Sequence, residues 1–169
     1  EYNSYVVLPQ CPENYIWSHH KVDPWLKGIK ESKNKDISYY GLLVIELIEN
    51  LIKNKNIDPN RIYISGLSMG GYGTFDLVSL RNDLFAAAAP ICGGADLTLL
   101  DKALDVPFWI FHGDLDRIVP VEKSRDAFDF LIKKRDHHKY TEYTGVYHNS
   151  WENVFDEEDF FMWLFSKSR

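Results

Sequence analysis

Gly66-Leu67-Ser68-Met69-Gly70 is the stretch that decides the fold of this chain. An apolar run rich in β-branched and aromatic residues, residues 61–65, precedes it, and a helix-compatible run, residues 72–80, follows it. A strand that turns sharply into a helix through Gly-x-Ser-x-Gly presents the serine hydroxyl as a nucleophile. The glycines let the strand and the helix pass close to a serine whose backbone is unfavourable. We therefore predict that Ser68 is a nucleophile and that the backbone N–H of Met69 forms an oxyanion hole.

A serine nucleophile needs a base, and the base needs an acid that orients it. In the strand–turn–helix arrangement these residues follow in the order serine, acid, histidine. The apolar run 106–111 predicts a buried strand that leads into an acidic stretch, residues 112–120, and the alternating run 139–143 predicts a strand that leads to His148. Because ligands bind at the carboxyl ends of parallel strands, we expect the acid and the histidine on the same rim as Ser68.

Several motifs in combination resemble the α/β-hydrolase fold, over nearly the whole chain. Within that fold they resemble the carboxylesterase, feruloyl esterase-like and predicted peptidase group. The stretches that carry the resemblance are Gly66-Leu67-Ser68-Met69-Gly70-Gly71, residues 112–120, His148-Asn149-Ser150-Trp151, Pro9-Gln10-Cys11-Pro12 with Trp17, and Ile57-Asp58-Pro59-Asn60-Arg61.

The resemblance implies a role for each matching residue. Ser68 matches the nucleophile, His148 the general base, and Asp116 the acid in the H-G-x-x-D-x-x-V-P pattern. Asp114 lies two residues from Asp116 and is the rival acid; its alternative role is that of a solvated turn residue. His112, at the end of a buried strand, is expected to be packed and hydrogen-bonded instead of catalytic.

Other candidate residues have less specific signals. Trp151 follows His148 by three residues, and Trp17 lies in the long segment after the first apolar run, so both are candidate substrate-binding residues. Ordinary packing is the alternative for both. The remaining histidines are expected at the surface, since their neighbours are polar or charged: His19, His20, His137 and His138.

Composition excludes several classes of function. A net charge of −6 argues against a nucleic-acid partner, and no apolar run approaches the roughly 20 residues that span a bilayer. The two cysteines, Cys11 and Cys92, both follow strand-like runs, so they are expected near the rim as free, packed thiols. No motif for a metal or an organic cofactor is present. The sequence leaves the compartment open between secreted and cytoplasmic for a soluble protein.

Alternating strands and helices predict a single α/β domain over residues 1–169, with a mainly parallel sheet covered on both faces. The resemblance implies that the apolar run at 5–8 is the fourth strand of the family fold. The first three strands would then be absent, together with the second oxyanion donor, and an N-terminal polypeptide segment would complete the fold. The remaining elements are expected as helices at 37–53, 120–134 and 155–166 and a strand at 84–91.

We therefore expect a serine hydrolase that cleaves carboxylic esters through an acyl-enzyme. The family group suggests feruloyl or acetyl esters of plant polysaccharide as the small-molecule substrate. A serine peptidase of the same fold is the alternative, because the same three residues serve both reactions. A non-catalytic fragment is a further alternative, motivated by the missing second oxyanion donor.

Overall fold

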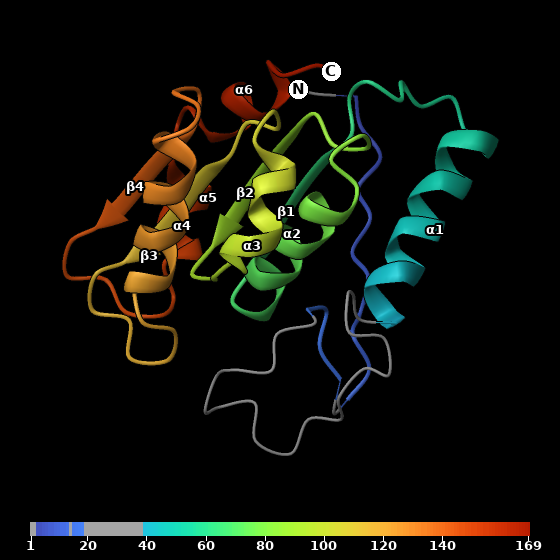
Figure 1. The fold of residues 1–169 in the computed structure, drawn as a ribbon. Helices are drawn as coiled ribbons and strands as arrows, with labels where there is room; N and C mark the ends of the chain where they lie inside the picture. Colours follow the sequence, from blue (N-terminus) through green and yellow to red (C-terminus); the bar gives the residue numbers. More distant parts are fainter. Residues whose placement is uncertain (1–2, 14, 19–38) are drawn as a thin grey trace.

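The computed structural model describes residues 3–13, 15–18 and 39–169. Their sheet has the order β1-β2-β3-β4, and every pair of neighbouring strands is parallel (Figure 1). The strands are β1 (Tyr63–Leu67), β2 (Ala87–Ile91), β3 (Trp109–Gly113) and β4 (Lys139–Tyr143). The helices are α1 (Tyr39–Asn54), α2 (Met69–Leu80), α3 (Leu97–Leu100), the 3-10 helix η2 (Asp101–Ala103), α4 (Glu122–Ile132), α5 (Trp151–Asp156) and α6 (Phe160–Phe165). The predicted α/β class with a parallel sheet is confirmed.

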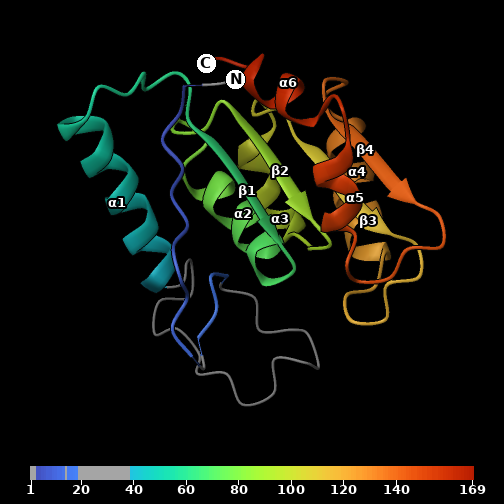
Figure 2. The same cartoon turned by 180° about the vertical axis from the view of Figure 1, so that it is seen from behind.

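Helices cover both faces of the sheet, as Figures 1 and 2 show from opposite sides. On one face, α2, α3 and α4 enclose an apolar core built around Phe75, Phe108 and Ile110. On the other face, α5 and α6 cover a smaller cluster that contains Phe111 and Phe160. Successive residues of a strand point to opposite faces, so each central strand supplies both cores.

All four strands end at the same edge of the sheet. The β1–β2 ladder runs from Tyr63↔Ala87 to Leu67↔Ile91, and the β3–β4 ladder runs from Trp109↔Lys139 to Gly113↔Tyr143. The β2–β3 pairing is sparser, because Pro90 has no N–H to donate to a ladder. The loops that follow β1, β3 and β4 therefore begin at the same edge of the sheet, as the sequence predicts for Ser68, the acid and His148.

The predicted strand at residues 5–8 is wrong. This segment is extended but pairs with no strand among the described residues, and its Val6 and Leu8 side chains are 76% and 88% exposed. A strand requires a partner for its backbone, and in Figures 1 and 2 the segment runs between α1 and β1 without joining the sheet. Because β1 is an edge strand among the described residues, it is only partly buried, and Leu67 is 40% exposed.

The single helix predicted over residues 155–166 is also wrong, because the chain forms two helices there, α5 and α6. Glu157 leaves the helical conformation with φ −66° and ψ 115°. Its carboxylate accepts a hydrogen bond of 3.0 Å from the Tyr143 hydroxyl, which ties the break to the end of β4. The other predicted elements agree to within a few residues, although positions 37 and 38 of the first helix, like His19 and His20, lie outside the described residues. Across the described ranges, every helix is too short or too polar to cross a bilayer.

Candidate active site

Ser68 occupies the turn between β1 and α2 in a strained backbone conformation. Its φ of 53° lies in the left-handed region that residues with a Cβ rarely adopt. The turn is held by the Ser68 N–H, which donates to the Ile91 carbonyl at 2.9 Å, and by the Ser68 carbonyl, which accepts from Gly71 N–H at 2.9 Å. A Cβ at Gly66 would lie 2.3 Å from the Gly70 carbonyl oxygen, so this turn requires a glycine at position 66. The prediction that a glycine before the serine lets the strand and the helix pass close together is therefore confirmed for Gly66.

The structure brings Ser68, His148 and Asp116 together in one hydrogen-bonded chain. The Nε2 atom of His148 lies 2.8 Å from Ser68 Oγ, and its Nδ1 atom lies 2.6 Å from Asp116 Oδ2. A carboxylate only accepts hydrogen bonds, so Nδ1 carries the proton and Nε2 accepts from the serine hydroxyl. The Asp116 side chain is fully buried and that of His148 is 20% exposed. This arrangement is suited to moving a proton from the serine to the imidazole.

Asp116 is held by donors at both of its oxygen atoms. The backbone N–H groups of Ile118 and Val119 donate to Oδ1 at 2.8 and 2.9 Å. Oδ2 faces His148, and His112 Nε2 lies 3.2 Å away from it. A buried charge is costly unless donors surround it, and these three hydrogen bonds, with His112 Nε2 close by, compensate for the loss of water.

Asp114 has a different environment from Asp116, although only one residue separates them. Its Oδ1 accepts the Gly145 N–H at 2.7 Å and so holds the loop that leads to His148. The neighbouring Gly113 permits a close approach of the same loop, because a Cβ there would lie 2.3 Å from the Val146 carbonyl oxygen. Of the two rival acids, Asp116 is the one that contacts the imidazole, and Asp114 supports the loop that carries it.

Of the described histidines, His112 and His138 are buried, although the sequence predicts burial only for His112. His112 is packed and hydrogen-bonded, as predicted, and burial lowers its pKa. His138 was expected at the surface, and this is wrong: it is 4% exposed and accepts the Phe108 N–H at 3.3 Å. It precedes the first residue of β4, where its ring packs near Phe108. Burial, together with the neighbouring His137, lowers the pKa of His138 to about 4.

Of the remaining candidate residues, Trp151 contacts His148, Trp17 contacts α2, and Met69 begins α2. The Trp151 ring meets the His148 ring edge-on, with centroids 5.6 Å apart. Trp17 packs against α2, where a Cβ on Gly73 would meet the Trp17 Cβ at 2.6 Å.

Met69 is the first residue of α2, and the N–H groups of a first helical turn have no acceptor within the helix. The Met69 N–H thus has no acceptor within α2.

Cys92 lies closer to this site than the sequence alone indicates. It follows β2 with a φ of 40°, and its Sγ lies within 4.8 Å of ligand-type atoms of Asp116 and His148. Burial raises the pKa of its thiol to about 12. A thiol that stays protonated is a poor metal ligand, and Asp116 and His148 already bind each other. The prediction of free, packed cysteines is confirmed for Cys92 and for Cys11.

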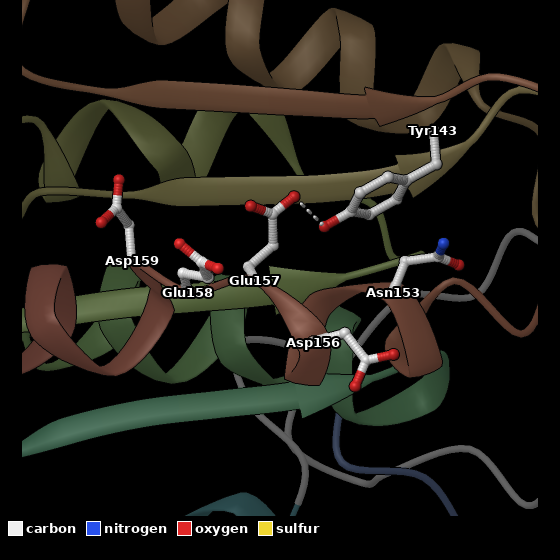
Figure 3. Close-up of a pocket in the computed structure, with 6 residues that line it drawn as sticks. All are labelled: Tyr143, Asn153, Asp156, Glu157, Glu158 and Asp159. Atoms are coloured by element: carbon white, nitrogen blue, oxygen red, sulfur yellow. Dashed lines mark hydrogen bonds between the residues drawn. The ribbon is translucent and has the colours of Figure 1, made fainter.

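An acidic pocket lies beside α5 and α6 (Figure 3). Its lining residues are Tyr143, Asn153, Asp156, Glu157, Glu158 and Asp159. The figure shows the Tyr143 hydroxyl directed at the Glu157 carboxylate, while Asp156 points elsewhere. Neither Ser68 nor His148 lines this pocket, so it is separate from the hydrogen-bonded chain described above.

A parallel sheet with a strained serine between strand and helix, and a histidine and an aspartate after later strands, defines an α/β-hydrolase fold. The chain belongs to the phospholipase/carboxylesterase family, whose family model matches residues 5–162.

Individual relatives support the esterase branch of this fold. A solved structure, described as a thermostable esterase, is 39% identical with a TM-score of 0.84 and aligns with 95% of this chain. The bifunctional acetylxylan esterase/xylanase XynS20E of Neocallimastix patriciarum is 38% identical over 94 residues, 55% of this chain. Cutinase est1 of Thermobifida alba is 35% identical over 97 residues, 57% of this chain. The chain spans 43% of the thermostable esterase, 13% of XynS20E and 32% of the cutinase.

Proposed function

We propose that this protein is a serine esterase in which Ser68 attacks the ester carbonyl. The observation that carries the proposal is the 2.8 Å contact between Ser68 Oγ and His148 Nε2, on an imidazole that Asp116 holds from its other side at 2.6 Å. The membership in a phospholipase/carboxylesterase family supports esters as the substrate class. A nucleophile, a base within hydrogen-bonding reach and a third group that orients the base are the requirements of acyl transfer.

The reaction would proceed in two halves. His148 takes the Ser68 proton as Oγ bonds to the carbonyl carbon, and the Met69 N–H donates to the oxyanion. The C–O bond of the ester then breaks, and the alcohol leaves with the proton from His148. Water next attacks the acyl-serine and gives one proton to His148. The bond between Ser68 Oγ and the acyl carbon then breaks, His148 returns the proton to Oγ, and the carboxylic acid leaves. Asp116 holds the imidazole tautomer and stabilises the imidazolium during both halves.

For the substrate we propose acetyl or feruloyl esters of plant polysaccharide. One relative is named for acetylxylan esterase activity, which supports the acetyl ester. Trp151 stands edge-on to His148 and offers an apolar or stacking surface beside the nucleophile, which suits a feruloyl ring. Trp17, packed on α2, is the second proposed substrate-binding residue.

We also propose that a further polypeptide segment adds strands beside β1 and supplies the second oxyanion donor. The exposed Val6 and Leu8 side chains and the partly buried β1 support this proposal. The test compares residues 1–169 alone with the same residues preceded by the N-terminal part of the thermostable esterase. Faster ester turnover and slower amide exchange in β1 are expected for the longer chain, and equal values for the two chains would contradict the proposal.

The experiment that tests the function offers p-nitrophenyl acetate, methyl ferulate and a panel of peptide amides to the protein and to Ser68→Ala. Turnover of the esters, and its loss in Ser68→Ala with an unchanged thermal midpoint, is the expected result. Turnover of the amides in preference to the esters would favour the peptidase. Absence of turnover and of fluorophosphonate labelling in a folded preparation would favour a non-catalytic fragment.

A further inference from the structure

His112 and His148 both lie close to Oδ2 of Asp116, and the proposed reaction does not use His112. Its side chain has no exposed surface. Its Nε2 atom lies 3.0 Å from the Val119 carbonyl oxygen and 3.2 Å from Asp116 Oδ2, and its Nδ1 atom lies 2.7 Å from Ser124 Oγ. Both ring nitrogens are therefore engaged by groups that no solvent reaches.

These contacts define the tautomer of His112. A carbonyl oxygen only accepts hydrogen bonds, so the proton of the neutral ring sits on Nε2, donates to the Val119 carbonyl at 3.0 Å and lies close to Asp116 Oδ2, which is 3.2 Å from Nε2. Nδ1 must then accept the hydroxyl proton of Ser124. The alternative acceptor for that hydroxyl, the Gly93 carbonyl, lies farther away at 3.2 Å. The hydrogen bonds run in one direction, from Ser124 through His112 to the Val119 carbonyl, and they place Nε2 3.2 Å from Asp116 Oδ2.

The two oxygen atoms of Asp116 are not equally fixed. Two backbone amides, of Ile118 and Val119, hold Oδ1. Oδ2 accepts the hydrogen bond from His148, and His112 Nε2, whose N–H donates to the Val119 carbonyl, also lies 3.2 Å from Oδ2. Because the carboxylate is buried, water does not replace a donor that is removed. His112 is thus placed to influence the direction in which Oδ2 faces His148.

We propose that His112 is a positioning residue that holds Oδ2 of Asp116 against His148, and that Ser124 keeps His112 in the required tautomer. This inference rests on the proposed function of Asp116. His112 and Ser124 touch no group that reacts, so their loss lowers kcat through the orientation of the imidazole and leaves KM nearly unchanged.

The test compares His112→Phe, which fills the space without a donor, with His112→Gln, whose amide N–H reaches the position of Nε2. We expect His112→Phe to lower kcat by about 10- to 100-fold, the effect of one hydrogen bond to a charged group. His112→Gln should recover most of that loss. Ser124→Ala should lower kcat by less than His112→Phe. His138→Phe is the matched control, since it removes a buried histidine far from Ser68 and should leave kcat unchanged.

A second readout does not require turnover. The proton between His148 Nδ1 and Asp116 Oδ2 gives a downfield proton resonance, which should shift or broaden in His112→Phe and return in His112→Gln. If the wild-type protein is inactive but the resonance shifts in His112→Phe and returns in His112→Gln, the proposed function is contradicted and the positioning role of His112 is supported. Wild-type kcat and an unchanged resonance in His112→Phe would overturn the inference, as would equal losses in the Phe and Gln variants. If His112→Phe does not fold, the same comparison is made with Ser124→Ala, where an unchanged kcat and resonance would overturn the proposal.

Discussion

Gly113 approaches Val146 so closely that a Cβ on the glycine would lie 2.3 Å from the Val146 carbonyl oxygen. The same carbonyl accepts the Leu115 N–H at 3.0 Å, so the loop after β3 and the loop after β4 touch backbone to backbone. One loop carries Asp116 and the other carries His148. The distance between acid and imidazole is therefore set by the absence of a side chain at position 113.

Replacing Gly113 with alanine should separate the two loops. Neither backbone has a flexible atom to move aside, so the loop that carries His148 must shift, and we expect kcat to fall by at least about tenfold, since small misplacements of reacting groups have large effects. The thermal midpoint should also fall. The measurement is kcat for an aryl ester together with a melting curve. A Gly113→Ala protein with wild-type kcat would show that the close approach does not position His148.

The two glycines around Ser68 should respond differently to alanine. A Cβ at Gly66 meets the Gly70 carbonyl at 2.3 Å, whereas a Cβ at Gly70 meets nothing within 4 Å. We expect Gly66→Ala to destabilise the fold by about 1–3 kcal/mol, the usual range for overpacking. Gly70 lies inside α2, where alanine favours the helix by up to about 1 kcal/mol. Urea unfolding of both variants tests this difference, and equal destabilisation would contradict it.

Acid should destabilise the protein through its buried histidines. Burial lowers the pKa of His138 to about 4, against a usual value near 6.5 when unfolded, so the unfolded chain binds the proton first. Stability is therefore full above about pH 6.5 and falls as the pH drops toward about 4, by at most about 3 kcal/mol for this group. Burial also lowers the pKa of His112, so protonation of His112 should likewise reduce the free energy of unfolding as the pH drops.

His138→Asn tests this assignment, because its side-chain oxygen can accept the Phe108 N–H without titrating. The free energy of unfolding, measured in urea from pH 4 to pH 7, should vary less with pH in His138→Asn than in the wild type. A steeper dependence in the variant would show that another group dominates.

Cys92 should be unreactive despite its position beside His148. Its thiol is buried, and burial raises its pKa to about 12, so little thiolate exists at neutral pH. Iodoacetamide should leave both activity and Cys92 unchanged in the folded protein and should alkylate Cys11 and Cys92 after unfolding in urea. Mass spectrometry of peptides from both samples gives the answer. Alkylation of Cys92 in the folded protein would contradict the prediction that its thiol is buried and protonated.

The sequence predicts best where short-range signals agree. The turn around Ser68 combines apolar, glycine and helix-forming residues, and β4 begins and ends at the predicted residues, 139 and 143. Its alternating pattern is a property of the strand itself. The three residues expected on one rim lie there, because parallel strands end on the same edge.

The predictions that differ from the structure depend on partners that a local pattern does not contain. Residues 5–8 have strand-like composition but no ladder among the described residues, so composition alone does not make them a strand. His138 has charged neighbours, yet the ring packs beside Phe108, which lies 30 residues earlier. The break between α5 and α6 coincides with a contact from Tyr143 to Glu157. The contact from His112 to Asp116 likewise follows from side-chain directions that the motif does not specify.

Ser68, His148 and Asp116 act as one unit in the proposed esterase, and covalent labelling of Ser68 tests this claim most directly. The protein is treated with a fluorophosphonate, and the intact mass and the modified peptide are measured for the wild type, Ser68→Ala and His148→Ala. We predict a single adduct on Ser68, none on Ser68→Ala, and labelling at least about a hundredfold slower in His148→Ala. A folded wild-type protein that carries its adduct elsewhere, or that reacts equally fast without His148, would contradict the account.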